Sequence, residues 1–283
     1  MIKALDHIAY VVNDLEAAVD GYTRLFGRAP NWRGDMHGAS QVWFQLGNMA
    51  LDVIAPTGEG PVGDAIRARL ASHGEGFYGV GFAVPDLAQA GHRFERVGLK
   101  AYPREEITTH PETGATRRWA VASLAPKATY GVNLFLVEQA PGVEPWPVAP
   151  VTVDEGSSVS GLDHVVIRTP NPDRAAALYG ARMGLDMRLD RSNPDWGTRL
   201  MFFRVGDLVV EIAHDLKAGV SDGPDEAWGL SWRVANVEAA HHRMAGQEIE
   251  VSEIRTGRKP GTRVFTVRSV PGGAPTLVIG PDA

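Results

Sequence analysis

The tripeptide Leu-Asp-His occurs twice in this sequence, at residues 5–7 and again at residues 162–164. Each copy opens a short apolar run, Leu5–Val12 in the first case and Leu162–Ile167 in the second. Each run is followed by a stretch with helical spacing and then by further strand-like runs. Because repetition on this scale indicates a duplicated architecture, the chain is expected to fold as copies of one supersecondary unit.

The first unit reads as a strand, a helix and a hairpin. Residues 5–12 are typical of a strand, and Asn13-Asp14 supplies the N-cap of a following helix. Apolar side chains then recur at helical spacing until Gly27 ends the pattern, at Leu15, Ala18, Val19, Tyr22 and Phe26. Two strand-like runs, 41–46 and 49–54, flank a Gly47-Asn48 turn, and residues 31–36 leave room for one more strand.

Three further units follow the same order of elements. A connection over 57–75, with a short helix over 62–71, leads into the second unit. The strands expected in the second unit are 79–84, 118–123 and 132–137. Those of the third unit are 163–168, 199–205 and 208–213, and those of the fourth unit are 229–234, 263–267 and 276–279. Aligning the helix caps places His7 in correspondence with Gly79, His164 and Gly229.

A linker is expected over residues 139–160, which contain four prolines and end in a Gly/Ser-rich segment. It divides the chain into an N-terminal domain, 1–138, with modules over about 4–56 and 76–138. The C-terminal domain, 161–283, then holds modules over about 161–215 and 227–281. The predicted fold class is α+β, with four βαβββ modules in one chain.

Composition restricts the partners. The formal net charge is −6 and there is no basic block, which argues against nucleic acid or an anionic membrane surface. The chain has no cysteine, so disulfide and thiol chemistry are excluded. Neither a signal peptide nor an apolar run long enough to span a bilayer is apparent, and a cytoplasmic protein is therefore expected.

The motifs Leu5–Ala18 (LDHIAYVVNDLEAA) and Leu162–Val166 (LDHVV) resemble those of the vicinal oxygen chelate superfamily. This superfamily includes glyoxalase I, methylmalonyl-CoA epimerase, extradiol ring-cleaving dioxygenases and bleomycin- or fosfomycin-resistance proteins. The resemblance covers nearly the whole chain apart from the linker. It implies that paired modules curl into U-shaped mixed sheets, with helices outside and a small-molecule cavity inside. A divalent metal often sits at the centre of such a cavity.

In this resemblance the metal ligands come from the first and last strands of each module. The first module offers His7 and Asp52, and the third offers His164 and Glu211. The second module has Gly79 and Phe135 at these positions, and the fourth has Gly229 and Val278, so neither supplies a donor. Each half then offers two metal ligands. Zinc is usually bound by three or four protein ligands, and non-haem iron usually by two His and one carboxylate. Only a pairing of modules one and three would unite all four donors.

Glu211 lies within the apolar run LVVEIA, where a carboxylate must be paired, hydrogen-bonded or bound to a metal. Two interpretations stay open: a metal at His164 and Glu211, or a direct hydrogen bond between them as the relic of a lost site. Strand aromatics that could line a cavity are Tyr10, Trp43, Phe135, Phe203 and Trp232. Strand arginines that could bind a carboxylate or phosphate are Arg168, Arg199, Arg204 and Arg233.

The first functional hypothesis is a metal-dependent enzyme, a lyase, isomerase or ring-cleaving dioxygenase acting on a small oxygenated substrate. The metal would be Fe, Mn, Zn, Ni or Co, and Glu211 would serve as a ligand or as the catalytic base. The alternative is a metal-free protein that binds or sequesters a small molecule, as bleomycin-resistance proteins do. A structural relic with a filled cavity is a third reading. A homodimer is plausible from the exposed sheet edges of this architecture.

Overall fold

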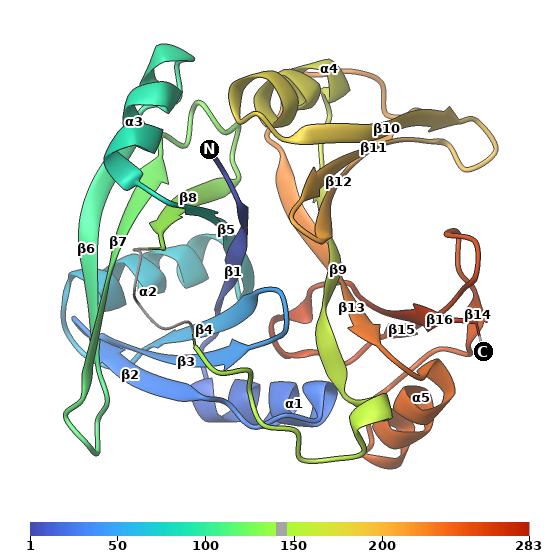
Figure 1. The fold of residues 1–283 in the computed structure, drawn as a ribbon, viewed down its shortest axis with the longest axis horizontal. Helices are drawn as coiled ribbons and strands as arrows, with labels where there is room; N and C mark the ends of the chain where they lie inside the picture. Colours follow the sequence, from blue (N-terminus) through green and yellow to red (C-terminus); the bar gives the residue numbers. More distant parts are fainter. Residues whose placement is uncertain (140–145, 283) are drawn as a thin grey trace.

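The computed structural model describes residues 1–139 and 146–282 and contains two eight-stranded sheets side by side (Figure 1). Part of the expected linker, 140–145, lies outside the described residues, and the division into two domains stays a prediction. The mixed α+β class with paired βαβββ modules is confirmed. Modules one and two share the first sheet, and modules three and four share the second.

The N-terminal sheet closes into a barrel in the order β1-β4-β3-β2-β6-β7-β8-β5. Its elements are β1 (Ala4–Val11), α1 (Leu15–Phe26), β2 (Trp32–Met36), β3 (Ala39–Gln45), β4 (Ala50–Pro56), α2 (Pro61–His73), β5 (Gly76–Val84), α3 (Leu87–Arg96), β6 (Ala101–Thr109), β7 (Thr116–Leu124) and β8 (Asn133–Glu138). The ring is closed by one bridge between β2 and β6, at Asp35 and Thr109. A closed barrel differs from the U-shape that the resemblance implies, because this bridge joins the two arms of the U.

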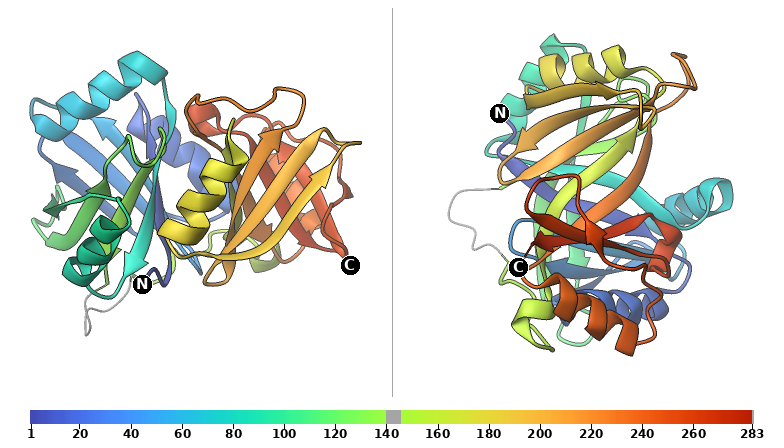
Figure 2. Two further views of the ribbon diagram at one scale, coloured as in Figure 1. Left: turned by 90° about the horizontal axis from the view of Figure 1, so that it is seen from above. Right: turned by 90° about the vertical axis from the view of Figure 1, so that its right-hand side faces the viewer.

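The C-terminal sheet stays open in the order β10-β11-β12-β9-β13-β16-β15-β14, and its two arms are visible on the right of Figure 1. Its elements are η1 (Glu155–Ser157), β9 (Val159–Arg168), α4 (Pro172–Ala176), η2 (Ala177–Arg182), β10 (Asp186–Asn193), β11 (Thr198–Val205), β12 (Leu208–Asp215), β13 (Glu226–Val234), α5 (Val237–Gly246), β14 (Arg255–Thr256), β15 (Thr262–Val267), η3 (Pro271–Gly273) and β16 (Thr276–Pro281). In the two further views of Figure 2 the two halves pack against each other, and Arg182 at the end of η2 donates to the carbonyl oxygens of Val97 and Gly98 across this junction.

The repeated caps explain why each module turns from strand to helix at the same point. The carboxylate of Asp14 accepts a hydrogen bond from the backbone of Ala17, and Gly27 ends α1 in the left-handed region at φ 63°. Side chains at the equivalent positions cap the helices of the other three modules, α3, α4 and α5, in the same way, namely Asp86, Asn171 and Asn236.

Alternation along the strands separates an apolar core from the inner faces of the sheets. In β12, Val210 and Ile212 are fully buried in the core, while Glu211 between them points the other way. The main core is continuous through both halves. At their junction the rings of Phe26 and Trp232 meet edge-on, with centroids 4.8 Å apart. No helix in the described ranges has both the length and the apolar character needed to cross a membrane.

Arg28, just after α1, connects the first module to residues 149 and 159. Its guanidinium donates to the carbonyl oxygens of Val159 at 2.6 Å and Ala149 at 2.7 Å, and only 7% of the residue is exposed. These buried carbonyls have to be hydrogen-bonded, because leaving them unpaired costs desolvation energy.

We predict that Arg28→Ala lowers the free energy of unfolding by about 2–4 kcal/mol, because two buried acceptors lose a charged donor. The exposed Arg67, which pairs with Asp64 on α2, provides the control. Arg67→Ala should change stability by less than about 1 kcal/mol. Denaturant unfolding measures both, and equal effects of the two substitutions would contradict the prediction.

Candidate functional site in the C-terminal half

The open C-terminal sheet encloses a cavity of about 740 Å³, here called the C-terminal cup. Its polar floor includes His164 of β9, Glu211 of β12 and Ser231 of β13. Apolar and aromatic side chains form its walls, among them Leu189, Phe202 and Trp228. A cavity of this size with a few converging polar groups has the character of a small-molecule site.

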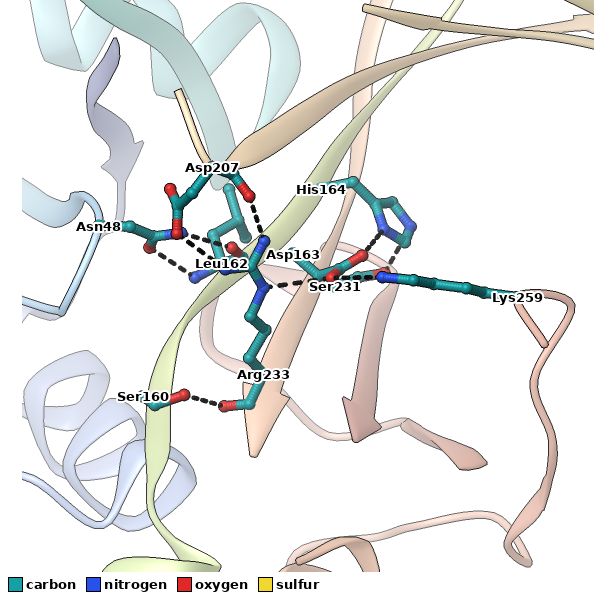
Figure 3. Close-up of polar contacts among 9 residues, drawn as sticks. All are labelled: Asn48, Ser160, Leu162, Asp163, His164, Asp207, Ser231, Arg233 and Lys259. Atoms are coloured by element: carbon teal, nitrogen blue, oxygen red, sulfur yellow. Dashed lines mark hydrogen bonds and ion pairs between the residues drawn. The ribbon is translucent and has the colours of Figure 1, made fainter. Parts of the chain in front are cut away.

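A β-bulge brings Asp163 and His164 to the same side of their strand. Ser231 pairs with His164 and Trp232 pairs with Leu162, so Asp163 is an extra residue without a partner on β13. A bulge of this kind re-aims a side chain that would otherwise point to the opposite face. The Asp163 carboxylate thereby reaches Nδ1 of the neighbouring His164 at 2.9 Å (Figure 3).

His164 is held through both ring nitrogens. Since a carboxylate only accepts hydrogen bonds, Nδ1 donates to Asp163 at 2.9 Å, and Nε2 is hydrogen-bonded with the Ser231 hydroxyl at 2.7 Å. Burial opposes ionisation of Asp163. The hydrogen bond from His164, the charges of His164 and Lys259 and the hydrogen bond from Arg233 outweigh it and lower the Asp163 pKa to about 2.

Glu211 differs from His164 in having no hydrogen-bond partner in the described part of the chain. Nε2 of His164 lies 3.7 Å from its Oε2. Burial raises the pKa of Glu211, against the opposing charges of His164 and Arg258. A carboxylate that faces a cavity without a hydrogen bond is available to accept a proton from a bound molecule.

The strand registers identify the counterparts of His164 and Glu211 in module four. Glu211 lies opposite Val166 on β9, and Leu277 lies opposite Ser231 on β13 in the same way. Leu277 and Gly229 line the cup, whereas Val278 is fully buried in the core. The expectation that Val278 takes the ligand position is therefore wrong by one residue, and a slip of one residue exchanges the two faces of a strand.

The side chains of the cup do not fit a resident metal. His164 and Glu211 are two donors, Gly229 and Leu277 add none, and the Ser231 hydroxyl already occupies Nε2 of His164. Within residues 1–139 and 146–282, no group of three or more His, Cys, Asp or Glu side chains is placed to hold a metal ion. A protein zinc site takes three or four protein ligands.

Comparison with known proteins agrees with the geometry of the sheets. The sequence profile of the glyoxalase/bleomycin resistance protein/dioxygenase superfamily matches residues 6–122 and 163–266. The chain belongs to this superfamily. An ethylmalonyl-CoA/methylmalonyl-CoA epimerase from Cereibacter sphaeroides is 30% identical over 119 residues, which are 41% of this chain and 83% of the epimerase.

Solved structures of similar fold cover the chain from end to end. A triple mutant of 4-hydroxymandelate synthase from Streptomyces coelicolor has a TM-score of 0.71 at 13% identity, over 100% of this chain and 93% of that one. The Mn(II)-bound glyoxalase from Novosphingobium aromaticivorans has a TM-score of 0.68 at 12% identity, over 99% of this chain and 82% of the other. At these identities the likeness concerns the fold.

The N-terminal half of this superfamily member keeps the equivalent pair inside its barrel. Nδ1 of His7 donates to the Asp6 carboxylate at 2.9 Å, beside a bulge like that at Asp163, and the His7 ring lies 5.1 Å from the ring of Trp43. Opposite His7 stands Gly81, where the C-terminal half has Ser231. The four donors His7, Asp52, His164 and Glu211 lie on two separate sheets, two to each, so modules one and three do not share a site.

Asp52 is buried, and its Oδ1 has no hydrogen-bond partner in the described part of the barrel. Burial raises its pKa from 3.8 to about 7, although the charge of His7 opposes the shift. Burial also opposes protonation of His7, but the hydrogen bond with Asp6 and the nearby carboxylates raise the His7 pKa overall.

The predicted cavity aromatics divide into two groups. Tyr10, Phe203 and Trp232 are fully buried in the apolar core, so their assignment to a cavity lining is corrected. Trp43 and Phe135 lie inside the N-terminal barrel, where Phe135 packs against Val121 and Val137. The aromatic residues that line the C-terminal cup are Trp196, Phe202 and Trp228. Phe202 and Phe203 are adjacent on β11, and strand alternation sends Phe202 to the cup and Phe203 to the core.

None of the four predicted strand arginines lines the cup in the described structure. Arg168 stacks on Trp228 at 3.9 Å, Arg199 pairs with Asp173 and Asp190, and Arg204 donates to the carbonyl oxygen of Gly206. Arg233 donates from Nε to Asp163 at 3.1 Å and pairs with Asp207, so it supports the floor from behind (Figure 3).

We predict that Asp52→Asn flattens the dependence of stability on pH. The pKa of Asp52 is about 7 in the folded protein, against 3.8 for the ordinary group. As the pH rises, the unfolded chain therefore releases the Asp52 proton at a lower pH than the folded protein does. Stability therefore falls as the pH rises from about 4 to about 7, by an amount on the order of 4 kcal/mol for this group.

Thermal or denaturant unfolding at several pH values between 4 and 8 measures this slope. Asp20→Asn on the exposed face of α1 is the control and should leave the slope of the parent protein unchanged. Parallel profiles for the parent and Asp52→Asn would contradict the prediction.

Proposed function

We propose that the protein is an enzyme that binds a small organic molecule in the C-terminal cup and transfers a proton between that molecule and Glu211. The observation that carries the proposal is the Glu211 carboxylate, which faces the cavity without a hydrogen-bond partner among the described residues and has a raised pKa. A buried carboxylate of this kind is suited to general base catalysis.

The surrounding groups supply the other requirements of proton abstraction next to a carbonyl. Asp163 and Ser231 fix the orientation of His164, so the imidazole keeps one position beside Glu211. Arg258 and Lys259 line the same cavity, and their positive charges favour an enolate-like anion over the neutral substrate. The partial similarity to an ethylmalonyl-CoA/methylmalonyl-CoA epimerase supports the same class of reaction.

We predict that the protein catalyses exchange of an acidic carbon-bound hydrogen with solvent and that Glu211→Gln abolishes this exchange. Methylmalonyl-CoA and ethylmalonyl-CoA are the first substrates to test in D₂O, followed by a set of small carbonyl acids. Incorporation of deuterium is followed by mass spectrometry. Loss of a general base lowers the rate by roughly 10²–10⁴-fold.

The control is Glu238→Gln, on the surface of α5, where Glu238 pairs with Arg263. It should exchange at the rate of the parent protein. Equal exchange by the parent and Glu211→Gln would remove Glu211 from the reaction. The absence of exchange with every compound, combined with tight binding of one of them, would favour a sequestering protein of the bleomycin-resistance type. The small number of metal-ligating side chains and the aromatic walls of the cup support a sequestering protein as the second candidate function.

A divalent metal stays a prediction, and the donor set argues for weak binding at most. We expect untagged protein, purified without chelator and then dialysed, to hold well under one equivalent of Fe, Mn, Zn, Ni or Co. Elemental analysis of the parent, His164→Ala and His7→Ala tests this. One equivalent in the parent that is lost only in His164→Ala would contradict the expectation and support a metal-dependent enzyme.

The remaining expectations concern partners and location. A small molecule is the proposed partner, since the family acts on such compounds. Absence of nucleic-acid and membrane partners, a cytoplasmic location and a homodimer all stay predictions.

A further inference from the structure

The two halves differ at one pair of strands. In the N-terminal barrel, β2 and β6 meet and close the ring at Asp35 and Thr109. The corresponding strands of the C-terminal half are β10 and β14, which end the sheet order on opposite sides and do not pair in the described structure. Side chains of both strands line the cup, Arg191 on β10 and Arg255 on β14 among them, so these two edges form its mouth. The two strands lie apart at the right of Figure 1.

Positive charges line both sides of this mouth. Arg191 stands on β10, Arg255 on β14, and Arg258 and Lys259 on the loop between β14 and β15, and all four line the cup. The chain as a whole has a formal net charge of −6, so this cluster of positive charges is a local feature of the mouth. Like charges facing each other across an opening repel, which disfavours the closure seen in the other half.

Among the described residues, the three arginines of the mouth lack the acidic partners that neighbouring arginines have. Arg188 on the same strand pairs with Asp186 at 2.8 Å. Among the described residues, no carboxylate lies within ion-pair distance of Arg191, Arg255 or Arg258, and Lys259 approaches Asp163 only at 3.8 Å. Arginines gathered at a cavity mouth without carboxylates provide donors for an anionic group of a ligand.

An aromatic surface lies directly beside the cations. Trp196, between β10 and β11, is 45% exposed, and the guanidinium of Arg258 lies over its ring at 4.4 Å from the centroid. Leu189 is also exposed, and both side chains line the cup. The mouth therefore combines positive charge with an apolar surface large enough for a ring.

We infer that the cup takes a ligand with an anionic group, a carboxylate, phosphate or sulfonate, attached to an apolar ring or chain. The anionic group binds between β10 and β14, and the apolar body packs on Trp196 and the inner walls above His164 and Glu211. The anion offsets the repulsion between the two edges and joins them across the gap. The inference deepens the proposed function because it uses the same cavity, but it does not depend on proton transfer by Glu211.

A pair of fluorescent probes tests the inference. The probe 8-anilino-1-naphthalenesulfonate carries a sulfonate on an apolar ring system, and N-phenyl-1-naphthylamine is its neutral counterpart. We predict that the anionic probe binds the parent protein and that Arg255→Gln/Arg258→Gln weakens its binding about tenfold or more, with less than about a twofold effect on the neutral probe. Binding of the anionic probe should also weaken as salt is raised.

The matched control is Arg268→Gln, which removes a positive charge from an exposed ion pair with Glu250 outside the cup. It should bind both probes as the parent does. Displacement of the anionic probe by 1-naphthoate or by 1-naphthyl phosphate identifies which oxyanion the mouth prefers. Equal binding of the two probes, or equal effects of the cup and control substitutions, would overturn the inference.

Glu211→Gln separates this inference from the proposed function. It should bind the anionic probe at least as tightly as the parent, because it removes a negative charge from the floor. Anion binding without any hydrogen exchange would leave the inference standing and contradict the enzymatic proposal. Hydrogen exchange on neutral substrates, together with no preference for the anionic probe, would support the enzymatic proposal and contradict the inference of an anion site.

Discussion

The β-bulge at Asp163 is the local constraint on which the C-terminal site depends. In a regular strand Asp163 and His164 would point to opposite faces, and the histidine would lose its acceptor. The extra residue brings the carboxylate to Nδ1 of His164, and Arg233 and Lys259 then gather around the same carboxylate. These contacts favour the ionised form of Asp163 and lower its pKa.

A chain of polar contacts connects Asp163 at the bulge to the boundary between the halves. Arg233 donates to Asp163 and pairs with Asp207, and Asp207 in turn accepts from Asn48 on the first hairpin of the chain (Figure 3). Asn48 is further fixed by two hydrogen bonds with the backbone of Leu162. The floor of the cup is therefore braced by the N-terminal half, although no donor of that half enters the cavity.

The sequence was sufficient to predict the repeats, because helix caps and apolar alternation are local signals. The repeated motif predicted His164 as a site residue, and the family resemblance predicted Glu211 as its partner, which the structure places 3.7 Å away. The closure of the first sheet was not predictable, since it rests on the single contact between Asp35 and Thr109 across two distant strands. Ser231 and the cations of the mouth were also not predicted from the sequence. They come together in one site only when β9, β10, β13 and β14 are placed in register. The slip between Val278 and Leu277 shows that an error of one residue is enough to exchange core and cavity.

The residue opposite the strand histidine differs between the halves, Gly81 in the first and Ser231 in the second. In the barrel, a Cβ at Gly81 would lie 2.7 Å from the ring of His7, so that position provides space and nothing more. At the equivalent position of the open sheet, Ser231 fills the space with a hydroxyl that bonds to His164. His7 is thus packed against Trp43 in a closed interior, whereas His164 is hydrogen-bonded on both sides and faces a cavity. Duplication supplied two similar frames, and the closure of one sheet together with the cations at the mouth of the other is the reason we propose ligand binding in the C-terminal half.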